Sequence, residues 1–152
     1  MTLKIVLVEP KIPPNTGNIA RTCAATGTQL HLVGPLGFEI SDRHLKRAGL
    51  DYWPHVDLHQ HESLDEFLAF SLKAGGRLIG YSVRGKHSYL QYQYRQGDWL
   101  LFGSETDGLS GKALQFCEDT LHIPIDARKV RSLNLSVSVA IGLFEARRQL
   151  DY

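Results

Sequence analysis

The sequence has no marked excess of charge of either sign, and this absence limits what its composition says about partners. Lys and Arg together number 17 and Asp and Glu 16, which gives a formal net charge of +1 over 152 residues. A nucleic-acid-binding protein is often strongly basic overall, so such a role would depend here on local patches of cations. With 43% hydrophobic and 22% charged residues, the composition excludes disordered, collagen-like and coiled-coil proteins.

Cysteines and long apolar stretches are also scarce. Cys23 and Cys117 lie far apart and form no CxxC motif, so neither a zinc ribbon nor a disulfide framework is expected. The apolar run from Ile5 to Val8 is too short for a signal peptide, and the stretch from Ser132 to Phe144 is too short and too polar to span a membrane. We expect a cytoplasmic protein with a single domain over residues 1–152, because no linker or repeat interrupts the chain.

Short β-branched runs alternate with segments of helical periodicity. The pattern predicts strands over residues 3–8, 30–33, 77–83, 98–103 and 120–125. It predicts helices over residues 15–27, 42–49, 62–76, 110–117 and 134–150. Asn15 or Thr16 would cap the first helix, and Ser63 with Glu66 would form a capping box. This alternation indicates an α/β domain with a mainly parallel sheet flanked by helices.

The last predicted helix is apolar on two sides. One stripe consists of Leu133, Val137, Ala140, Ile141 and Phe144, and the other of Leu135, Val139, Leu143 and Ala146. A helix of a small domain normally turns one face to water, so the second stripe indicates either a deeply buried helix or contact with a partner subunit.

Three polar clusters are candidates for a functional site, although each also has a structural explanation. In Asn15-Thr-Gly-Asn18-Ile-Ala-Arg21, Asn18 and Arg21 lie one helical turn apart, which indicates either a site or a solvated face. The turn Gly103-Ser-Glu-Thr-Asp-Gly108 lacks the lysine of a phosphate-binding loop because Leu109 stands there. This turn follows the carboxyl end of a predicted strand, which is where open α/β folds bind ligands. Its two carboxylates suit a neutral or cationic ligand. Alternatively, it is an ordinary turn into a helix capped by Ser110.

The third cluster, Ser132-Leu-Asn134-Leu-Ser136, begins the last helix and follows the three cations Arg128, Lys129 and Arg131. Asparagine and serine are good helix caps, which is the structural explanation. Backbone N–H groups and arginines that converge at a helix start also bind anions.

Other chemistries are less consistent with the sequence. His55, Asp57, His59 and His61 would share one face of a strand, which resembles a set of metal ligands. An edge strand with Val56 and Leu58 toward the core gives the same pattern, and we therefore expect no metal. The chain has neither a GxGxxG turn after its first strand nor a GxSxG elbow, which argues against a dinucleotide-binding turn and an α/β-hydrolase.

The order and spacing of the three polar clusters resemble the SPOUT superfamily of RNA methyltransferases, in particular the SpoU type that methylates ribose 2′-hydroxyl groups. The similar segments are residues 15–21, residues 101–109, and Ile123-Pro-Ile followed by residues 132–140. The segment EPKIPPNTGNI, Gly37-Phe and Arg47-Ala-Gly-Leu-Asp-Tyr52 are similar to the minimal branch that methylates the wobble ribose of leucine tRNAs. That branch acts on C34 or 5-carboxymethylaminomethyl-U34 and has no appended RNA-binding domain.

This resemblance implies a C-terminal deep trefoil knot, S-adenosylmethionine as cofactor, a tRNA anticodon stem-loop as substrate, and a homodimer. It implies cofactor contacts at five positions: Tyr81, Gly103, Ile123, Ser132 and Leu133. It implies that Arg21 lies at the target ribose, surrounded by Asn15, Glu105, Asn134 and Ser136. RNA phosphates would contact cations at Arg43, Lys46 and Arg47, at Arg84 and Lys86, and at residues 128–131.

This chain departs from the branch at two positions. The branch commonly has arginine where this chain has Asp107, and asparagine where this chain has Val137. Two alternative functions therefore stay open on the same fold. One is ribose methylation at another tRNA or rRNA position, and the other is RNA binding without catalysis.

Overall fold

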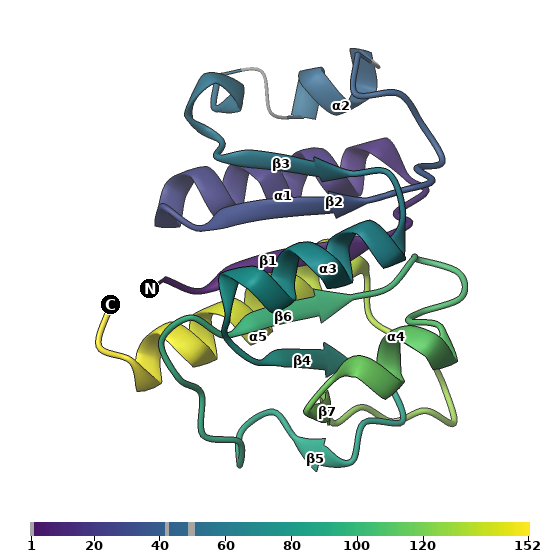
Figure 1. The fold of residues 1–152 in the computed structure, drawn as a ribbon. Helices are drawn as coiled ribbons and strands as arrows, with labels where there is room; N and C mark the ends of the chain where they lie inside the picture. Colours follow the sequence, from purple (N-terminus) through teal and green to yellow (C-terminus); the bar gives the residue numbers. More distant parts are fainter. Residues whose placement is uncertain (1, 42, 49–50) are drawn as a thin grey trace.

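A parallel sheet forms the centre of the molecule (Figure 1). In the computed structural model, which describes residues 2–41, 43–48 and 51–152, seven strands pair in the order β3-β2-β1-β6-β4-β7-β5. All neighbouring strands are parallel. The strands are β1 (Lys4–Val8), β2 (Gln29–Val33), β3 (Leu58–His61), β4 (Leu78–Tyr81), β5 (His87–Ser88), β6 (Trp99–Phe102) and β7 (Asp119–His122).

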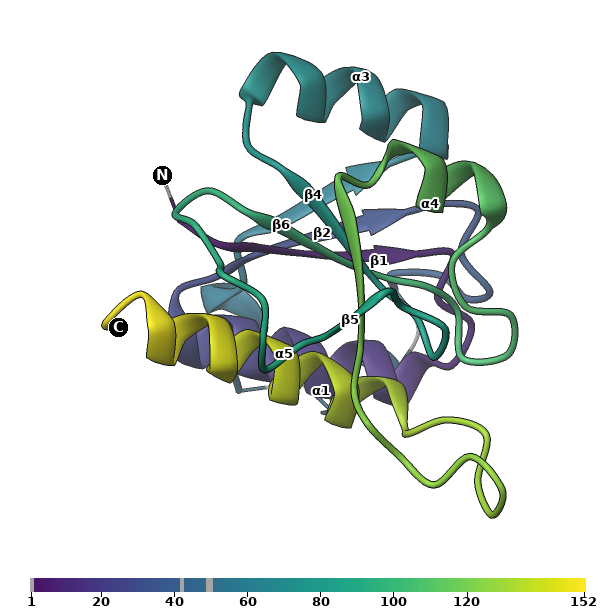
Figure 2. The ribbon, with the colours of Figure 1, turned by 90° about the horizontal axis from the view of Figure 1, so that it is seen from below.

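Helices cover both faces of this sheet. They are α1 (Pro13–Thr26), α2 (Arg43–Ala48), α3 (Leu64–Ala74), α4 (Gly111–Phe116) and α5 (Leu135–Gln149), with a 3-10 turn, η1, at Trp53–His55. Figure 2 shows α1 and α5 on one face and α3 and α4 on the other. The predicted α/β architecture with a mainly parallel sheet is thus confirmed. Among the helices of the described residues, none is long and apolar enough to cross a membrane.

The sequence of β1 explains why both faces are covered. All five of its residues are buried. Ile5 and Leu7 belong to the core that includes residues of α1 and α5. Val6 and Val8 belong to a second core, which includes Phe67 of α3. Successive strand residues point to opposite faces, so the apolar run over residues 5–8 needs a helical layer on each side.

The start of α1 differs from the prediction. The helix begins at Pro13, and its N-cap is Ile12, which makes no side-chain cap hydrogen bond. Neither Asn15 nor Thr16 caps it. Prolines fit the first helical turn because an N–H group there would have no acceptor inside the helix. The N–H groups of Lys11 and Ile12, just before the helix, donate to the carboxylate of Glu105.

Three other local predictions were tested by the structure. Ser63 caps α3 by accepting a hydrogen bond from the Glu66 N–H at 3.1 Å. The Glu66 carboxylate, however, accepts from the N–H of Glu62 rather than from that of Ser63. The basic helix is confirmed over Arg43–Ala48, while Asp42, Gly49 and Leu50 lie outside the described residues. Periodicity missed β5 and η1, which span only two and three residues.

The histidine pattern is only partly as predicted. β3 is an edge strand, as expected, but it begins at Leu58, so His55 lies in η1 and does not share the strand face. His31 of β2 joins the cluster instead: its Nδ1 is 3.0 Å from His61 Nε2, and its ring stacks on His59 at 4.5 Å. The described residues contain no group of three or more potential ligands arranged to hold a metal ion.

Acid should destabilise the protein through His31. Burial, with smaller effects of His59, His61 and Lys4, lowers the pKa of His31 to about 3. Its neutral form is therefore favoured in the folded state, and the resulting stability is present above pH 6.5 and lost as the pH falls toward 3. Between pH 6.5 and 5, we expect the free energy of unfolding to fall by roughly 1.5 kcal/mol more in the wild type than in His31→Asn.

Urea unfolding at the two pH values measures this difference. His55 is exposed, so His55→Asn should keep the wild-type dependence on pH. If the free energy of unfolding fell equally between pH 6.5 and 5 in the wild type and in His31→Asn, His31 would not contribute to acid sensitivity.

Candidate active site

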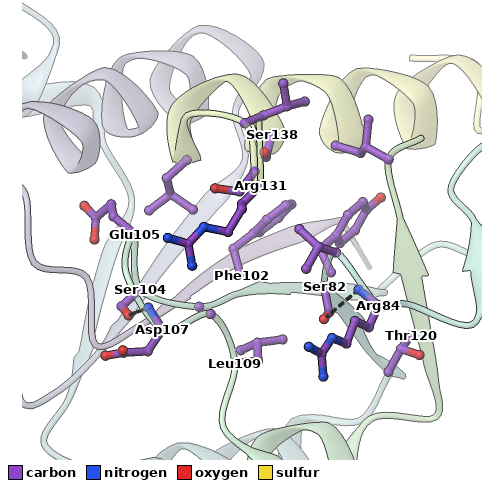
Figure 3. A pocket seen from close by; sticks show the side chains of 18 of the residues that line it. Ser82, Arg84, Phe102, Ser104, Glu105, Asp107, Leu109, Thr120, Arg131 and Ser138 are labelled. Atoms are coloured by element: carbon purple, nitrogen blue, oxygen red, sulfur yellow. Dashed lines mark hydrogen bonds between the residues drawn. The ribbon is translucent and has the colours of Figure 1, made fainter. Parts of the chain in front are cut away.

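A cavity of about 590 Å³ opens at the carboxyl ends of β4, β6 and β7. This edge of a parallel sheet is where open α/β folds bind ligands. Figure 3 shows side chains of the sheet edge and of the segment that leads into α5 gathered around it. The lining includes all five positions at which the resemblance implied cofactor contacts: Tyr81, Gly103, Ile123, Ser132 and Leu133.

Tyr81 forms a rigid part of the cavity wall. Its ring stacks on Phe102 with centroids 4.5 Å apart. The Tyr94 hydroxyl donates to the backbone carbonyl of Tyr89 at 3.1 Å. Tyr81 therefore donates its own proton to the Tyr94 hydroxyl, 2.6 Å away. Burial raises the pKa of Tyr81, which keeps the hydroxyl neutral.

Gly103 allows the turn after β6 to fold back tightly on itself. A Cβ atom at this position would lie 1.9 Å from the carbonyl carbon of Gly108 and 2.1 Å from the N of Leu109. Within the turn, Ser104 Oγ accepts a hydrogen bond from the N–H of Asp107 at 3.0 Å. Ser110 caps α4 by accepting from the N–H of Ala113, so the structural explanation of this segment is also confirmed.

A hydrogen-bond network joins this turn to the starts of α1 and α5. The Glu105 carboxylate accepts from the N–H groups of Lys11 and Ile12 at 2.8 and 2.9 Å. It also accepts from Asn15 Nδ2 at 3.2 Å. Asn134 Nδ2 in turn donates to Asn15 Oδ1 at 3.1 Å.

Asn134 completes the network at the start of α5. Its Oδ1 accepts from both the N–H and the hydroxyl of Ser136, at 2.9 and 2.6 Å. Asn134 is thus the helix cap that its residue type predicts. The structure brings together four of the site residues named from the sequence, Asn15, Glu105, Asn134 and Ser136, although Asn134 is 119 positions from Asn15 along the chain.

Arg21 lies apart from this network. It is exposed on α1, as the predicted polar face requires, and its guanidinium carbon is 4.6 Å from the centre of the Tyr52 ring. It does not line the cavity. Arg21 of one chain therefore does not reach the cavity of the same chain in this conformation.

The charge distribution at the cavity could not be read from the sequence. Arg84 and Arg131 line it, although the sequence indicated Arg84 only as part of a cation patch for RNA phosphates and Arg131 as one of the cations that precede the last helix. Asp107 also lines the cavity, and its carboxylate forms an ion pair with Lys11 at 2.7 Å. The Lys11 ammonium group holds the pKa of Asp107 below its usual range. Further polar groups at the cavity that sequence reasoning missed are Ser82, Thr120 and Ser138.

Comparison with known proteins agrees with this geometry. The model of the SpoU rRNA Methylase family matches residues 2–144. A Synechocystis protein named "Putative tRNA (cytidine(34)-2'-O)-methyltransferase" is 61% identical over 148 residues, covering 97% of this chain and 97% of that protein. A Burkholderia cenocepacia protein named "tRNA (cytidine(34)-2'-O)-methyltransferase" is 42% identical over 149 residues, covering 97% and 96%.

Two solved structures of methyltransferase-related proteins superpose closely on this chain. One described as "Structural insights into the 2-OH methylation of C/U34 on tRNA" superposes with a TM-score of 0.93 at 50% identity, covering 99% of this chain and 97% of that one. The SpoU methyltransferase AviRb from Streptomyces viridochromogenes, in complex with AdoMet, superposes with a TM-score of 0.89 at 26% identity, covering 99% of this chain and 58% of that one.

Proposed function

Because this chain belongs to the SpoU rRNA methylase family, we propose that it methylates the ribose 2′-hydroxyl of the wobble nucleotide in leucine tRNAs. Its relatives are named tRNA (cytidine(34)-2'-O)-methyltransferases, and one similar structure concerns 2-OH methylation of C/U34 on tRNA. We propose C34 or 5-carboxymethylaminomethyl-U34 as the target. The observation that carries this proposal is the cavity at the sheet edge, which residues of the second and third similar segments line and whose Glu105 is hydrogen-bonded to Asn15 of the first.

We propose S-adenosylmethionine as the methyl donor, and the cavity fits it. The cavity volume, about 590 Å³, lies within the range typical of small-molecule sites. Phe102, Ile123 and Leu135 offer apolar surface for an adenine ring, and Ser82 and Ser138 offer hydroxyl groups. Gly103 lets the backbone approach closely. The proposed contacts are those of Tyr81, Gly103, Ile123, Ser132 and Leu133.

The residues of the chain position the ribose and stabilise charge on it. When bound, S-adenosylmethionine supplies an electrophilic methyl group on a positively charged sulfur, which becomes a neutral thioether on transfer. Arg21 donates hydrogen bonds to the ribose 2′-oxygen and stabilises the negative charge that develops there. A guanidinium stays protonated, so the proton passes to an RNA phosphate or to water rather than to Arg21. Asn15, Glu105, Asn134 and Ser136 hold the two helix starts beside the reacting groups.

A homodimer would bring Arg21 to the cavity. Val137 and Phe144, in the stripe of α5 that also contains Ala140 and Ile141, are 46% and 51% exposed, which supports a partner surface there. Arg21 of the partner subunit would then complete each site. The Phe144→Glu variant should sediment as a monomer at low micromolar concentration, where the wild type sediments as a dimer. Phe116→Glu, at a 56% exposed position on α4, should remain dimeric. An active wild-type monomer would refute the proposal.

The remaining features of the family extend the proposal. We propose that residues 1–152 act as one SPOUT domain in the cytoplasm, with the C-terminal segment threaded into a trefoil knot. The superpositions over nearly the whole chain support this assignment. Exposed Arg43 and Arg47 on α2 would contact phosphates of the anticodon stem-loop.

The function is tested by incubating the protein with total tRNA and S-adenosylmethionine and mapping new ribose methylation by nuclease digestion and mass spectrometry. We expect methylation at position 34 of leucine tRNAs. Methylation elsewhere would favour the alternative of another RNA position. Binding of tRNA without binding of labelled S-adenosylmethionine would instead indicate a non-catalytic RNA-binding factor.

A further inference from the structure

Four charged side chains line the cavity, and the two acidic ones are already engaged. Glu105 and Asp107 supply the carboxylates, and Arg84 and Arg131 the guanidinium groups. Two backbone N–H groups and the Asn15 amide donate to Glu105. Lys11 Nζ donates to Asp107 at 2.7 Å. Asp107 is therefore paired with a cation, Glu105 is hydrogen-bonded to neutral donors, and neither forms a salt bridge with an arginine among the described residues.

The arginines, by contrast, lack acidic partners. Within the described part of the chain, no carboxylate lies at salt-bridge distance from the guanidinium of Arg84 or Arg131. Arg128 differs, although it belongs to the same cationic segment as Arg131. Its guanidinium forms a two-pronged pair with Asp126, with N–O distances of 2.9 and 3.0 Å.

The two arginines occupy different walls of the cavity. In Figure 3, Arg131 extends from the segment before α5 toward Phe102, and Arg84 lies near Ser82 and Thr120. Lys11 pairs with Asp107, so the two guanidinium groups outnumber the remaining carboxylate, that of Glu105, and make the potential of the cavity positive. Each offers a planar fork of N–H donors, which matches the two oxygens of a carboxylate or phosphate.

We propose that Arg84 and Arg131 make the cavity an oxyanion-binding site, in addition to the five proposed cofactor contacts and apart from Arg21. The inference rests on the proposed function, because that function brings two such oxyanions to the cavity. One is the carboxylate of the methionyl part of the cofactor, and the other is a tRNA phosphate. Both present the same chemistry to a guanidinium, and binding measurements separate them.

The test compares Arg84→Gln, Arg131→Gln and the double variant with the matched control Arg128→Gln, which removes a charge from the same segment. Calorimetry measures the affinity for S-adenosylhomocysteine and for 5′-methylthioadenosine, which lacks the amino-acid part. If the oxyanion is the carboxylate, affinity for the first should fall roughly 10-fold per arginine, while affinity for the second stays unchanged. Arg128→Gln should resemble the wild type in both titrations.

If the oxyanion is a phosphate, cofactor affinities should stay unchanged and the KM for tRNA should rise roughly 10-fold. The slope of log KM against log salt concentration should then decrease by about 1 per arginine. The inference is overturned if the double variant has the wild-type affinity for both nucleosides and the wild-type KM for tRNA. The inference is also overturned if an arginine variant loses affinity equally for S-adenosylhomocysteine and 5′-methylthioadenosine, because an equal loss indicates a deformed cavity. A wild type that methylates no tRNA would overturn the proposed function instead.

Discussion

Replacing Arg21 with alanine should reduce methyl transfer by roughly 100-fold or more while leaving the affinity for S-adenosylmethionine nearly unchanged. The guanidinium is exposed on α1 and outside the cavity, so its removal leaves the cofactor contacts intact. It would act on the ribose oxygen, where negative charge develops only as the methyl group moves. The loss of an interaction that is made only in the transition state lowers kcat and kcat/KM together. Initial rates and calorimetric titration with S-adenosylmethionine measure the two quantities.

Asn18→Ala is the matched control for this variant. Asn18 is exposed on the same face of α1, one turn before Arg21, so both substitutions shorten a polar side chain at the helix surface. We expect Asn18→Ala to retain nearly wild-type turnover. Normal turnover in Arg21→Ala would contradict the assignment, and parallel losses of turnover and cofactor affinity would indicate a structural role for Arg21.

The fold could be predicted from the sequence because its central strands carry an unusually clear signal. β6 and residues 5–8 of β1 are apolar, and both strands are buried throughout, which fits only a sheet covered on both faces. Shorter elements lacked such a signal. β5 has two residues, and its pairing with β7 arises from tertiary contacts rather than from periodicity.

The site was less predictable because its contacts connect distant parts of the chain. No local pattern indicates that Glu105 accepts hydrogen bonds from the N–H groups of Lys11 and Ile12, more than 90 residues away. The resemblance indicated which residues gather, and the structure shows how they connect. Local sequence also could not distinguish Arg128 from Arg131, because only the folded segment directs one to Asp126 and the other to the cavity.

Gly103→Ala should abolish measurable cofactor binding, and with it methyl transfer. The added Cβ atom would lie within 2.3 Å of three backbone atoms of Gly108 and Leu109. Backbone atoms cannot rotate away as a flexible side chain can, so the turn over residues 103–108 must open. This turn forms one wall of the cavity and carries Glu105, so its displacement would disturb both the cofactor contacts and the helix starts. We expect an affinity loss of roughly 100-fold or more, equivalent to about 3 kcal/mol.

Two neighbouring glycines separate this steric effect from other consequences of an alanine. Gly108 has no heavy atom within 4 Å of an added Cβ but has a φ of +67°, so Gly108→Ala should cost about 1 kcal/mol of stability and little affinity. Gly111, in the first turn of α4, has neither constraint. Because alanine favours helices, Gly111→Ala should keep the affinity and raise the free energy of unfolding by about 0.5–1 kcal/mol. Calorimetry and urea unfolding of the three variants test this order. Equal affinities in Gly103→Ala and Gly111→Ala would show that the tight turn does not form the cofactor site.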